Sequence, residues 1–170
     1  MKPIVSIIMG STSDLPVMEK ACKWFEENEI PFELNALSAH RTPDAVESFA
    51  KGAQSRGIRV IIAAAGMAAA LPGVIAASTT LPVIGVPIKG MLDGLDAMLS
   101  IIQMPPGIPV ATVGVNAAQN AAILAAQIIA LSDADVAQKV AAHKAGLSKK
   151  IEKANAELAA IKEYKFKVER

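Results

Sequence analysis

The sequence is poor in the residue types from which many catalytic sites are built. Its 170 residues include one cysteine and two histidines, and aromatic residues make up only 4% of the chain. The single cysteine, Cys22, excludes an intramolecular disulfide and a thiolate metal cage, and it fits a reduced, cytoplasmic setting. Because the two histidines lie far apart in the chain and no carboxylates cluster, we expect no metal ion. No nucleotide-cofactor signature is present, so we expect no organic cofactor either.

Charge and long apolar runs are also scarce. Charged residues make up 19% of the chain and the net charge is +1, which gives no general field to attract nucleic acid or anionic lipid. No stretch reaches the roughly 18 uninterrupted apolar residues that a membrane span needs. We therefore expect a soluble protein with neither a nucleic-acid nor a membrane partner.

The residues that are present alternate between two periodicities. Apolar residues make up 52% of the chain, and short β-branched runs are followed by segments with helical spacing. Strands are predicted at residues 4–9, 32–37, 59–64, 83–86 and 110–113, with helices at 15–28, 44–56, 74–78 and 95–102. Because the strands are apolar on both faces, this pattern predicts a parallel sheet covered by helices on each side. We expect one catalytic domain over residues 1–170, a three-layer α/β/α sandwich with a flavodoxin-like sheet.

Three further segments bear on assembly and on access to a site. Residues 116–131 are apolar on every side, which favours burial at a subunit junction in a homo-oligomer. Residues 133–170 are charged and alanine-rich with helical spacing, and we expect a helical extension packed on a neighbouring subunit. Residues 89–109 form a long connection punctuated by glycine and proline, with a short predicted helix, and are a candidate lid over the site.

Two polar loops follow the first two predicted strands. Gly10-Ser11-Thr12-Ser13-Asp14 offers hydroxyls and backbone N–H groups that suit an anion, although Ser13 or Asp14 alone could simply cap a helix. Ser38-Ala39-His40-Arg41-Thr42-Pro43 places a proton carrier, His40, beside a fixed cation, Arg41. Taken alone, His40 could be a loop histidine bonded to backbone, and Arg41 a surface charge. Together with the first loop they predict an anion clamp and a general acid/base in one cleft.

A third loop is made almost entirely of small residues. Ala64 to Gly73 removes side chains, so that a ligand can approach the backbone and an apolar pocket can form. Tight helix packing is the alternative explanation for the same small residues. The second histidine, His143, falls in the C-terminal helical pattern and is expected to be solvated or interfacial.

Four segments closely resemble the PurE family of purine biosynthesis, over nearly the whole chain. They are Gly10-Ser11-Thr12-Ser13-Asp14, Ser38-Ala39-His40-Arg41-Thr42-Pro43, the run Ala65 to Gly73, and Gln103-Met104-Pro105-Pro106-Gly107-Ile108-Pro109. The His-Arg-Thr-Pro form resembles the mutases that move a carboxylate from N5 to C4 of an aminoimidazole ribonucleotide without ATP, metal or cofactor. In direct carboxylases of the family a lysine commonly follows the histidine.

The resemblance implies a role for each matched residue. His40 transfers the proton, Ser11, Asp14 and Arg41 bind the ribonucleotide, and Ser38 and Ala39 line the site. In the third loop, Gly66, Ala68 and Leu71 are expected to contact the substrate. Many of these mutases carry a histidine where this chain has Ala70, so the second family histidine is absent. The usual assembly of the family is an octamer.

Other functions stay open at this point. A direct aminoimidazole ribonucleotide carboxylase would use the same loops. A non-catalytic nucleotide-binding domain would use the Ser11 to Asp14 loop but would have no need for His40. A flavin or nicotinamide oxidoreductase would need a cofactor signature that the sequence lacks.

Overall fold

Strands and helices alternate along the chain, as the sequence predicts. The computed structural model describes residues 2–165. The strands are β1 (Val5–Met9), β2 (Phe32–Ala36), β3 (Val60–Gly66), β4 (Val83–Ile88) and β5 (Ala111–Thr112). The helices are the 3₁₀ turn η1 (Thr12–Asp14), α1 (Leu15–Glu27), α2 (Pro43–Arg56), α3 (Leu71–Ser78), α4 (Leu95–Ile102), α5 (Ala118–Ala130) and α6 (Ala134–Ala159). Helix α2 ends where expected, at Gly57, whose φ of 97° suits a residue without a side chain.

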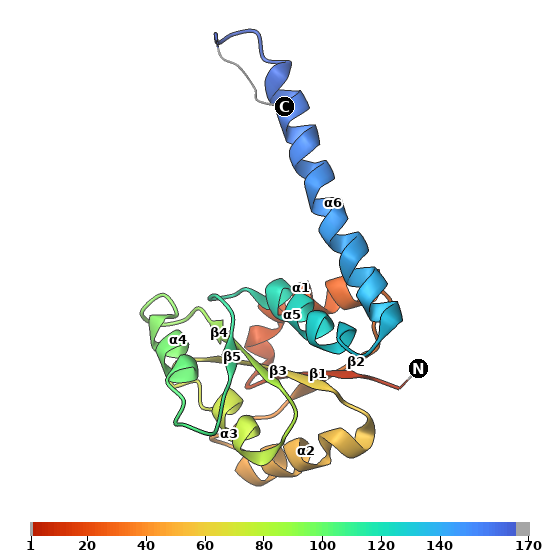
Figure 1. Cartoon of the computed structure of the whole chain (residues 1–170). Coiled ribbons are helices and arrows are strands. Elements are labelled where there is room, and N and C mark those ends of the chain that lie inside the picture. Colours follow the sequence, from red (N-terminus) through yellow and green to blue (C-terminus); the bar gives the residue numbers. More distant parts are fainter. Residues whose placement is uncertain (1, 166–170) are drawn as a thin grey trace.

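The five strands form one parallel sheet in the order β2-β1-β3-β4-β5. Helices α1 and α5 cover one face and helices α2, α3 and α4 cover the other (Figure 1). This confirms the three-layer α/β/α sandwich and the flavodoxin-like strand order. In this order the chain reverses direction across the sheet between β1 and β3, which is where open α/β folds bind ligands.

Burial varies across the sheet with the position of each strand. Every residue of β1 and β4 is buried, and β3 is buried up to Gly66. Strand β2 is only partly buried, with Leu34 43% exposed. Because β2 lies at the edge of the sheet, one of its flanks has no neighbouring strand. The other edge strand, β5, is likewise exposed or only partly buried, so the expectation of strands apolar on both faces holds for the central strands and is wrong for β2 and β5.

Helix α5 differs from the expectation of a helix without a polar face. Its buried face packs against α1, β3 and β4 and consists of Ala118, Ala121, Ala122, Ala125, Ala126 and Ile129, each at most 1% exposed. Gln119, Asn120 and Gln127 are exposed. Small alanine side chains let α5 lie close to the sheet, so that its apolar face is covered by other elements of the same chain. The premise that this helix has no polar face is thus wrong, and a subunit junction at α5 stays a prediction.

The segment 89–109 also differs from its prediction as a lid. Helix α4 packs on the sheet through Ala97 and Ile101, both fully buried in the core beside α2 and α3. The side chains of Ile101 and Val110 occupy the space next to Gly85, which leaves no room for a β-carbon there. The helical part of the segment is therefore a fixed part of the core.

Helix α6 begins on the body and then leaves it. The Asp133 carboxylate caps α6 by accepting from the backbone N–H of Val136 at 3.2 Å. Val136, Val140 and His143 occupy one face of its first turns, and Nδ1 of His143 accepts a hydrogen bond from Nε1 of Trp24 at 3.2 Å. Beyond His143 the helix projects away from the other elements (Figure 1).

This confirms a C-terminal helical extension, of which residues 166–170 lie outside the described part of the chain. His143 lies in the contact between α6 and α1, and is not a freely solvated side chain. None of the helices in residues 2–165 combines the length and hydropathy of a membrane span.

Candidate active site

A pocket lies at the carboxyl ends of β1, β2 and β3, at the point where the strand order reverses. It has a volume of about 330 Å³. Its lining residues are Gly10, Ser11, Ser13, Asp14, Ser38, Ala39, His40, Arg41, Ala65, Gly66, Met67, Ala69, Ala70 and Leu71. Residues about thirty positions apart in the sequence meet here, because parallel pairing brings the ends of β1, β2 and β3 side by side.

The first loop forms a 3₁₀ turn with its own cap. The hydroxyl of Ser11 accepts from the backbone N–H of Ser13 at 3.3 Å, so Ser11 is the residue that caps η1. Asp14 stands at the start of α1 but makes no side-chain capping hydrogen bond there. The capping explanation for Asp14 is therefore wrong, and its carboxylate lines the pocket instead.

Among the described residues, Asp14 is the one acidic side chain in the pocket wall. It is 9% exposed, and Oδ1 accepts from the Ser13 hydroxyl at 3.4 Å. Burial raises the pKa of this carboxyl above its ordinary value, and hydrogen bonds from the Ser13 side chain and the Ser11 backbone offset part of that rise. A buried carboxylate with a spare oxygen suits a hydroxyl or N–H donor on a ligand.

The second loop is joined to the first by Arg41. Its Nη2 donates to the carbonyl oxygen of Gly10 at 3.0 Å, which holds the guanidinium over the first loop. The backbone N–H of Arg41 donates to the hydroxyl of Ser38 at 3.3 Å. Arg41 therefore places a cation in the same pocket wall as Ser11 and Ser13, an arrangement suited to an anion.

His40 lies in the same loop and is exposed at the pocket wall. No hydrogen bond to its imidazole occurs among the described residues. Its ring nitrogens are thus available to a ligand, unlike those of His143, where Nδ1 is bonded to Trp24.

The third loop forms the apolar wall. After β3 the chain turns sharply, with the backbone of Met67 and Ala69 in the left-handed region at φ of 57° and 39°. Such a conformation is disfavoured for residues with a side chain, and it is common at functional sites. The turn brings Ala69 and Ala70 into the pocket wall and leaves Met67 65% exposed at its rim.

Most of the residues predicted from sequence meet in this pocket. Lining residues among them are Ser11, Asp14, Ser38, Ala39, His40, Arg41, Gly66 and Leu71. Ala68 does not line the pocket, because the left-handed turn on either side leaves it exposed.

Six lining residues were not predicted as site residues, namely Gly10, Ser13, Ala65, Met67, Ala69 and Ala70. Gly10 and Ser13 belong to the predicted first loop and could have been found by including the whole loop. The positions in the third loop depend on the direction of a strained turn, for which the sequence gives no signal.

A metal site is a separate question from the pocket. Across residues 2–165 no three His, Cys, Asp or Glu side chains are grouped so that they could hold a metal ion. The pocket offers one carboxylate, one imidazole and one guanidinium. This set suits proton transfer and anion binding better than metal binding.

Comparison with known proteins matches the chain to one family. The family model described as AIR carboxylase matches residues 4–150. An N5-carboxyaminoimidazole ribonucleotide mutase from Pyrococcus horikoshii is 53% identical over 152 residues, which is 89% of this chain and 86% of that protein. A phosphoribosylaminoimidazole carboxylase from Candida glabrata is 56% identical over 140 residues, 82% of this chain but 25% of that longer protein.

A solved structure agrees with the sequence comparison. PurE from Treponema denticola superposes with a TM-score of 0.83 at 31% identity, covering 92% of this chain and 98% of that one. The fold, the loops around the pocket and the sequence matches therefore agree, and this chain belongs to the AIR carboxylase family.

Proposed function

We propose that this chain is an N5-carboxyaminoimidazole ribonucleotide mutase of purine biosynthesis, forming 4-carboxy-5-aminoimidazole ribonucleotide. Relatives of that name match most of this chain at 53–57% identity. The observation that carries the proposal is the meeting of His40, Arg41 and Asp14 with an apolar wall in one pocket. Those groups suit an anionic, ring-containing substrate whose reaction requires a proton transfer.

The ribonucleotide would lie across the pocket with its phosphate beside the first loop. Arg41 is bonded to Gly10 and lines the pocket together with Ser11 and Ser13, so this corner is the cationic end of the pocket. The Asp14 carboxylate would repel a phosphate and would accept a hydrogen bond from the ribose. The imidazole ring would then face Gly66 and Ala70, whose small side chains leave room for it, and the apolar side chain of Leu71.

His40 would serve both halves of the reaction. In the first half the bond between N5 and the carboxylate carbon breaks, CO₂ forms, and N5 takes a proton from His40. In the second half C4 attacks the CO₂ carbon, and the proton on C4 passes back to His40. The proton given equals the proton taken, so no cofactor is required for balance. An apolar wall keeps water from the CO₂ and holds it close to C4.

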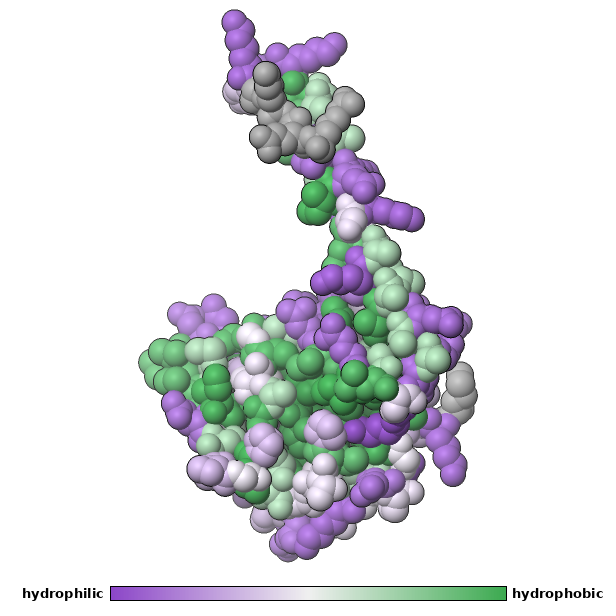
Figure 2. All heavy atoms as spheres, viewed as in Figure 1, coloured by the Kyte–Doolittle hydropathy of each residue, from purple (hydrophilic) through white to green (hydrophobic). Residues whose placement is uncertain are grey.

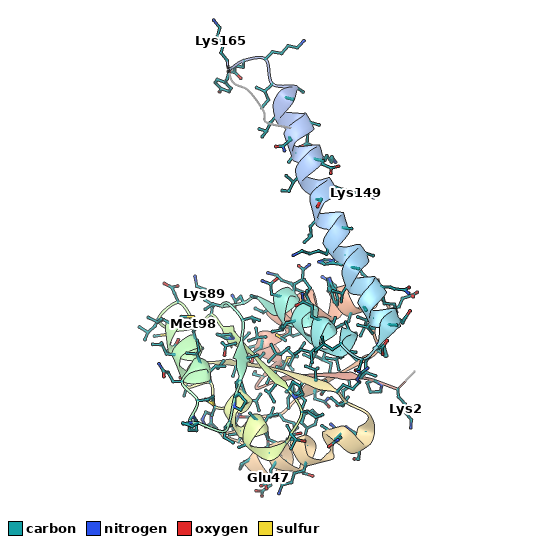
Figure 3. The ribbon with its side chains drawn as sticks, viewed as in Figure 1. Lys2, Glu47, Lys89, Met98, Lys149 and Lys165 are labelled. Carbon is teal, nitrogen blue, oxygen red and sulfur yellow. The ribbon has the colours of Figure 1, made fainter. Side chains whose placement is uncertain are left out.

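A homo-oligomer, an octamer by the family resemblance, is part of the proposal. The distal part of α6 carries Leu147, Ile151, Ala154 and Leu158 at helical spacing on one face, which we call the α6 stripe. Leu147, Ile151 and Leu158 are 43%, 63% and 46% exposed, and Figure 3 shows this part of α6, around Lys149, standing clear of the other elements.

A second exposed apolar set lies on the body. Figure 2 shows apolar side chains gathered over α4 and the turn before it, where Met91, Leu92, Leu95, Leu99 and Ile102 are exposed. Soluble monomers rarely expose sets of this kind together, and a second copy of the chain would cover both. Cytoplasmic location belongs to the same proposal and is supported by the free thiol of Cys22.

One assay tests the activity and separates it from the alternatives. Purified protein without added cofactor is given either N5-carboxyaminoimidazole ribonucleotide, or aminoimidazole ribonucleotide with bicarbonate. Rapid product formation from the carbamate alone is the expected result. Turnover only with bicarbonate would indicate the direct carboxylase. The Candida glabrata relative is named as a carboxylase, so this alternative is included in the test. Binding of the ribonucleotide without turnover would indicate a nucleotide-binding domain.

A further inference from the structure

The loop that carries His40 is closed largely by one hydroxyl. The hydroxyl of Thr42 accepts from the backbone N–H of Ser38 at 3.0 Å and donates to the carbonyl oxygen of Ser38 at 3.0 Å. The backbone N–H of Thr42 donates to the same carbonyl at 2.8 Å. His40 stands midway between the two bonded residues. Since its imidazole makes no hydrogen bond of its own among residues 2–165, the shape of this loop decides where the ring lies.

The Thr42 hydroxyl does not cap helix α2, although threonine at this position commonly does so. Thr42 occupies the position before α2 where threonine normally caps a helix, yet it makes no side-chain capping hydrogen bond. Pro43 follows it and disfavours a helical conformation at Thr42, whose φ and ψ are −138° and 56°. The structure instead directs the hydroxyl back onto Ser38.

The hydroxyl also supports the anion clamp. Thr42 is hydrogen-bonded to both the backbone N–H and the carbonyl of Ser38. The hydroxyl of Ser38 in turn accepts a hydrogen bond from the backbone N–H of Arg41. Arg41 in turn bonds to Gly10 on the first loop. Loss of the Thr42 hydroxyl would leave the N–H of Ser38 without its partner and would loosen this chain of contacts at its start. Thr42 itself does not line the pocket.

We propose that Thr42 is a positioning residue for the reaction, whose hydroxyl fixes the Ser38 to Thr42 loop and so sets the place of His40. This inference rests on the proposed function, because it assigns Thr42 to the proton transfer by His40. A shift of about 1 Å in a reacting group can cost on the order of a hundredfold in rate. Arg41 is also bonded directly to Gly10, independently of Thr42, so binding of the phosphate changes less than the position of His40, and kcat is affected more than KM.

The experiment compares Thr42→Val, Thr42→Ser and a matched control, Thr80→Val. Thr80 is an exposed threonine before β4, at the opposite end of the sheet, and its hydroxyl has no hydrogen-bond partner among the described residues. Thr42→Val is expected to lower kcat by about 10- to 100-fold with KM within about threefold. Thr42→Ser restores kcat to within about threefold of the wild type, and Thr80→Val matches the wild type. A Thr42→Val enzyme with wild-type kcat would overturn the inference, as would failure of Thr42→Ser to restore the rate.

A second measurement does not depend on turnover. The chain has two histidines, so the ring resonances of ¹⁵N-labelled protein report His40 and carry His143 as an internal reference. Thr42→Val is expected to shift or broaden the His40 signals alone, and Thr42→Ser to leave them near their wild-type positions. Unchanged His40 signals in Thr42→Val would overturn the positioning role. Failure of the proposed function would show differently, as a wild-type protein without mutase turnover.

Discussion

In the pocket, polar side chains find hydrogen-bond partners within one chain, whereas in the distal half of α6 apolar side chains stay exposed. In the pocket, Ser11 caps its own turn, Arg41 bonds to Gly10, and Thr42 closes the loop around His40. Within residues 2–165 the α6 stripe is not buried against another element, although it continues the same helix face as the buried Val136. Short-range hydrogen bonds can shape a polar site within one subunit, whereas an exposed apolar stripe needs a second surface.

The largest expected effect lies in the pocket. His40→Asn removes the proton carrier but keeps a polar side chain of similar reach, so kcat should fall by about a hundredfold or more. Ligand affinity should stay within about tenfold, since Arg41, Ser11 and Asp14 remain. Steady-state kinetics and calorimetric titration with the ribonucleotide check the two halves of the prediction. If kcat stays near the wild-type value, His40 is not the proton carrier. Oligomer size, measured by light scattering, should be unchanged in this variant, because His40 lies in the pocket and not on the α6 stripe.

Arg41→Ala should act on binding more than on the chemical step. Loss of a charged hydrogen bond costs about 1.5–3 kcal/mol, which corresponds to a rise in KM of roughly 10- to 150-fold. Ser11→Ala should raise KM in the same direction by a smaller factor. Kinetics on both variants provide the measurement. Were KM to stay unchanged in both, the phosphate would have to bind away from the first loop.

Ile151→Glu should break the α6 stripe without touching the pocket. A charge placed in an apolar contact is unfavourable, and we expect association to weaken by about tenfold or more. Ala156→Glu, on the opposite, exposed face of the same helix, is the control and should leave assembly unchanged. Sedimentation velocity over a range of concentrations measures the effect. Equal assembly of both variants and the wild type would mean that the stripe is not a subunit contact.

Charged substitutions in α5 would test assembly less cleanly. Ile123 and Ile128 are partly buried and pack against the core beside α1 and the sheet. A glutamate at either position would destabilise the fold of the subunit itself, so loss of assembly there would not identify an interface.

The smallest expected effect concerns the stability of the pocket. Burial raises the pKa of Asp14, so the charged form is less favourable in the folded state than in the unfolded chain. Because the pKa of Asp14 is higher in the folded protein than in the unfolded chain, protonation of Asp14 favours the folded state. This stabilisation is lost as the pH rises through the raised pKa. Asp14→Asn should therefore raise the melting temperature at neutral pH by a few degrees at most, while weakening ligand binding.

The pH dependence gives the check on this last prediction. Thermal melts of wild type and Asp14→Asn should differ most at neutral pH and converge at acidic pH, where the carboxyl is protonated in both states. A gap that grows as the pH falls would contradict the sign of the Asp14 shift.

The pocket was more predictable than the surfaces for a physical reason. The pattern of β-branched runs followed by polar loops places Ser11, His40 and Arg41 after successive strands, and parallel pairing then brings those loops together without further information. The direction of Ala68 depends on the left-handed backbone of Met67 and Ala69, which a run of small residues does not reveal. For α5, the sequence pattern shows how many residues are apolar but not that the alanines pack closely on the sheet of the same chain.

The sequence by itself determined the order of strands and helices, the layered architecture and the identity of the polar groups in the pocket. These follow from side-chain periodicity and from residue types at strand ends, both of which are local properties. Only the tertiary structure decided that Asp14 is free of capping, that Thr42 turns its hydroxyl onto Ser38, and that helix α4 joins the core through Ala97 and Ile101. Each of these outcomes depends on which of several possible partners lies nearest in space. Hydrogen bonds and close packing select that partner only once distant segments have met.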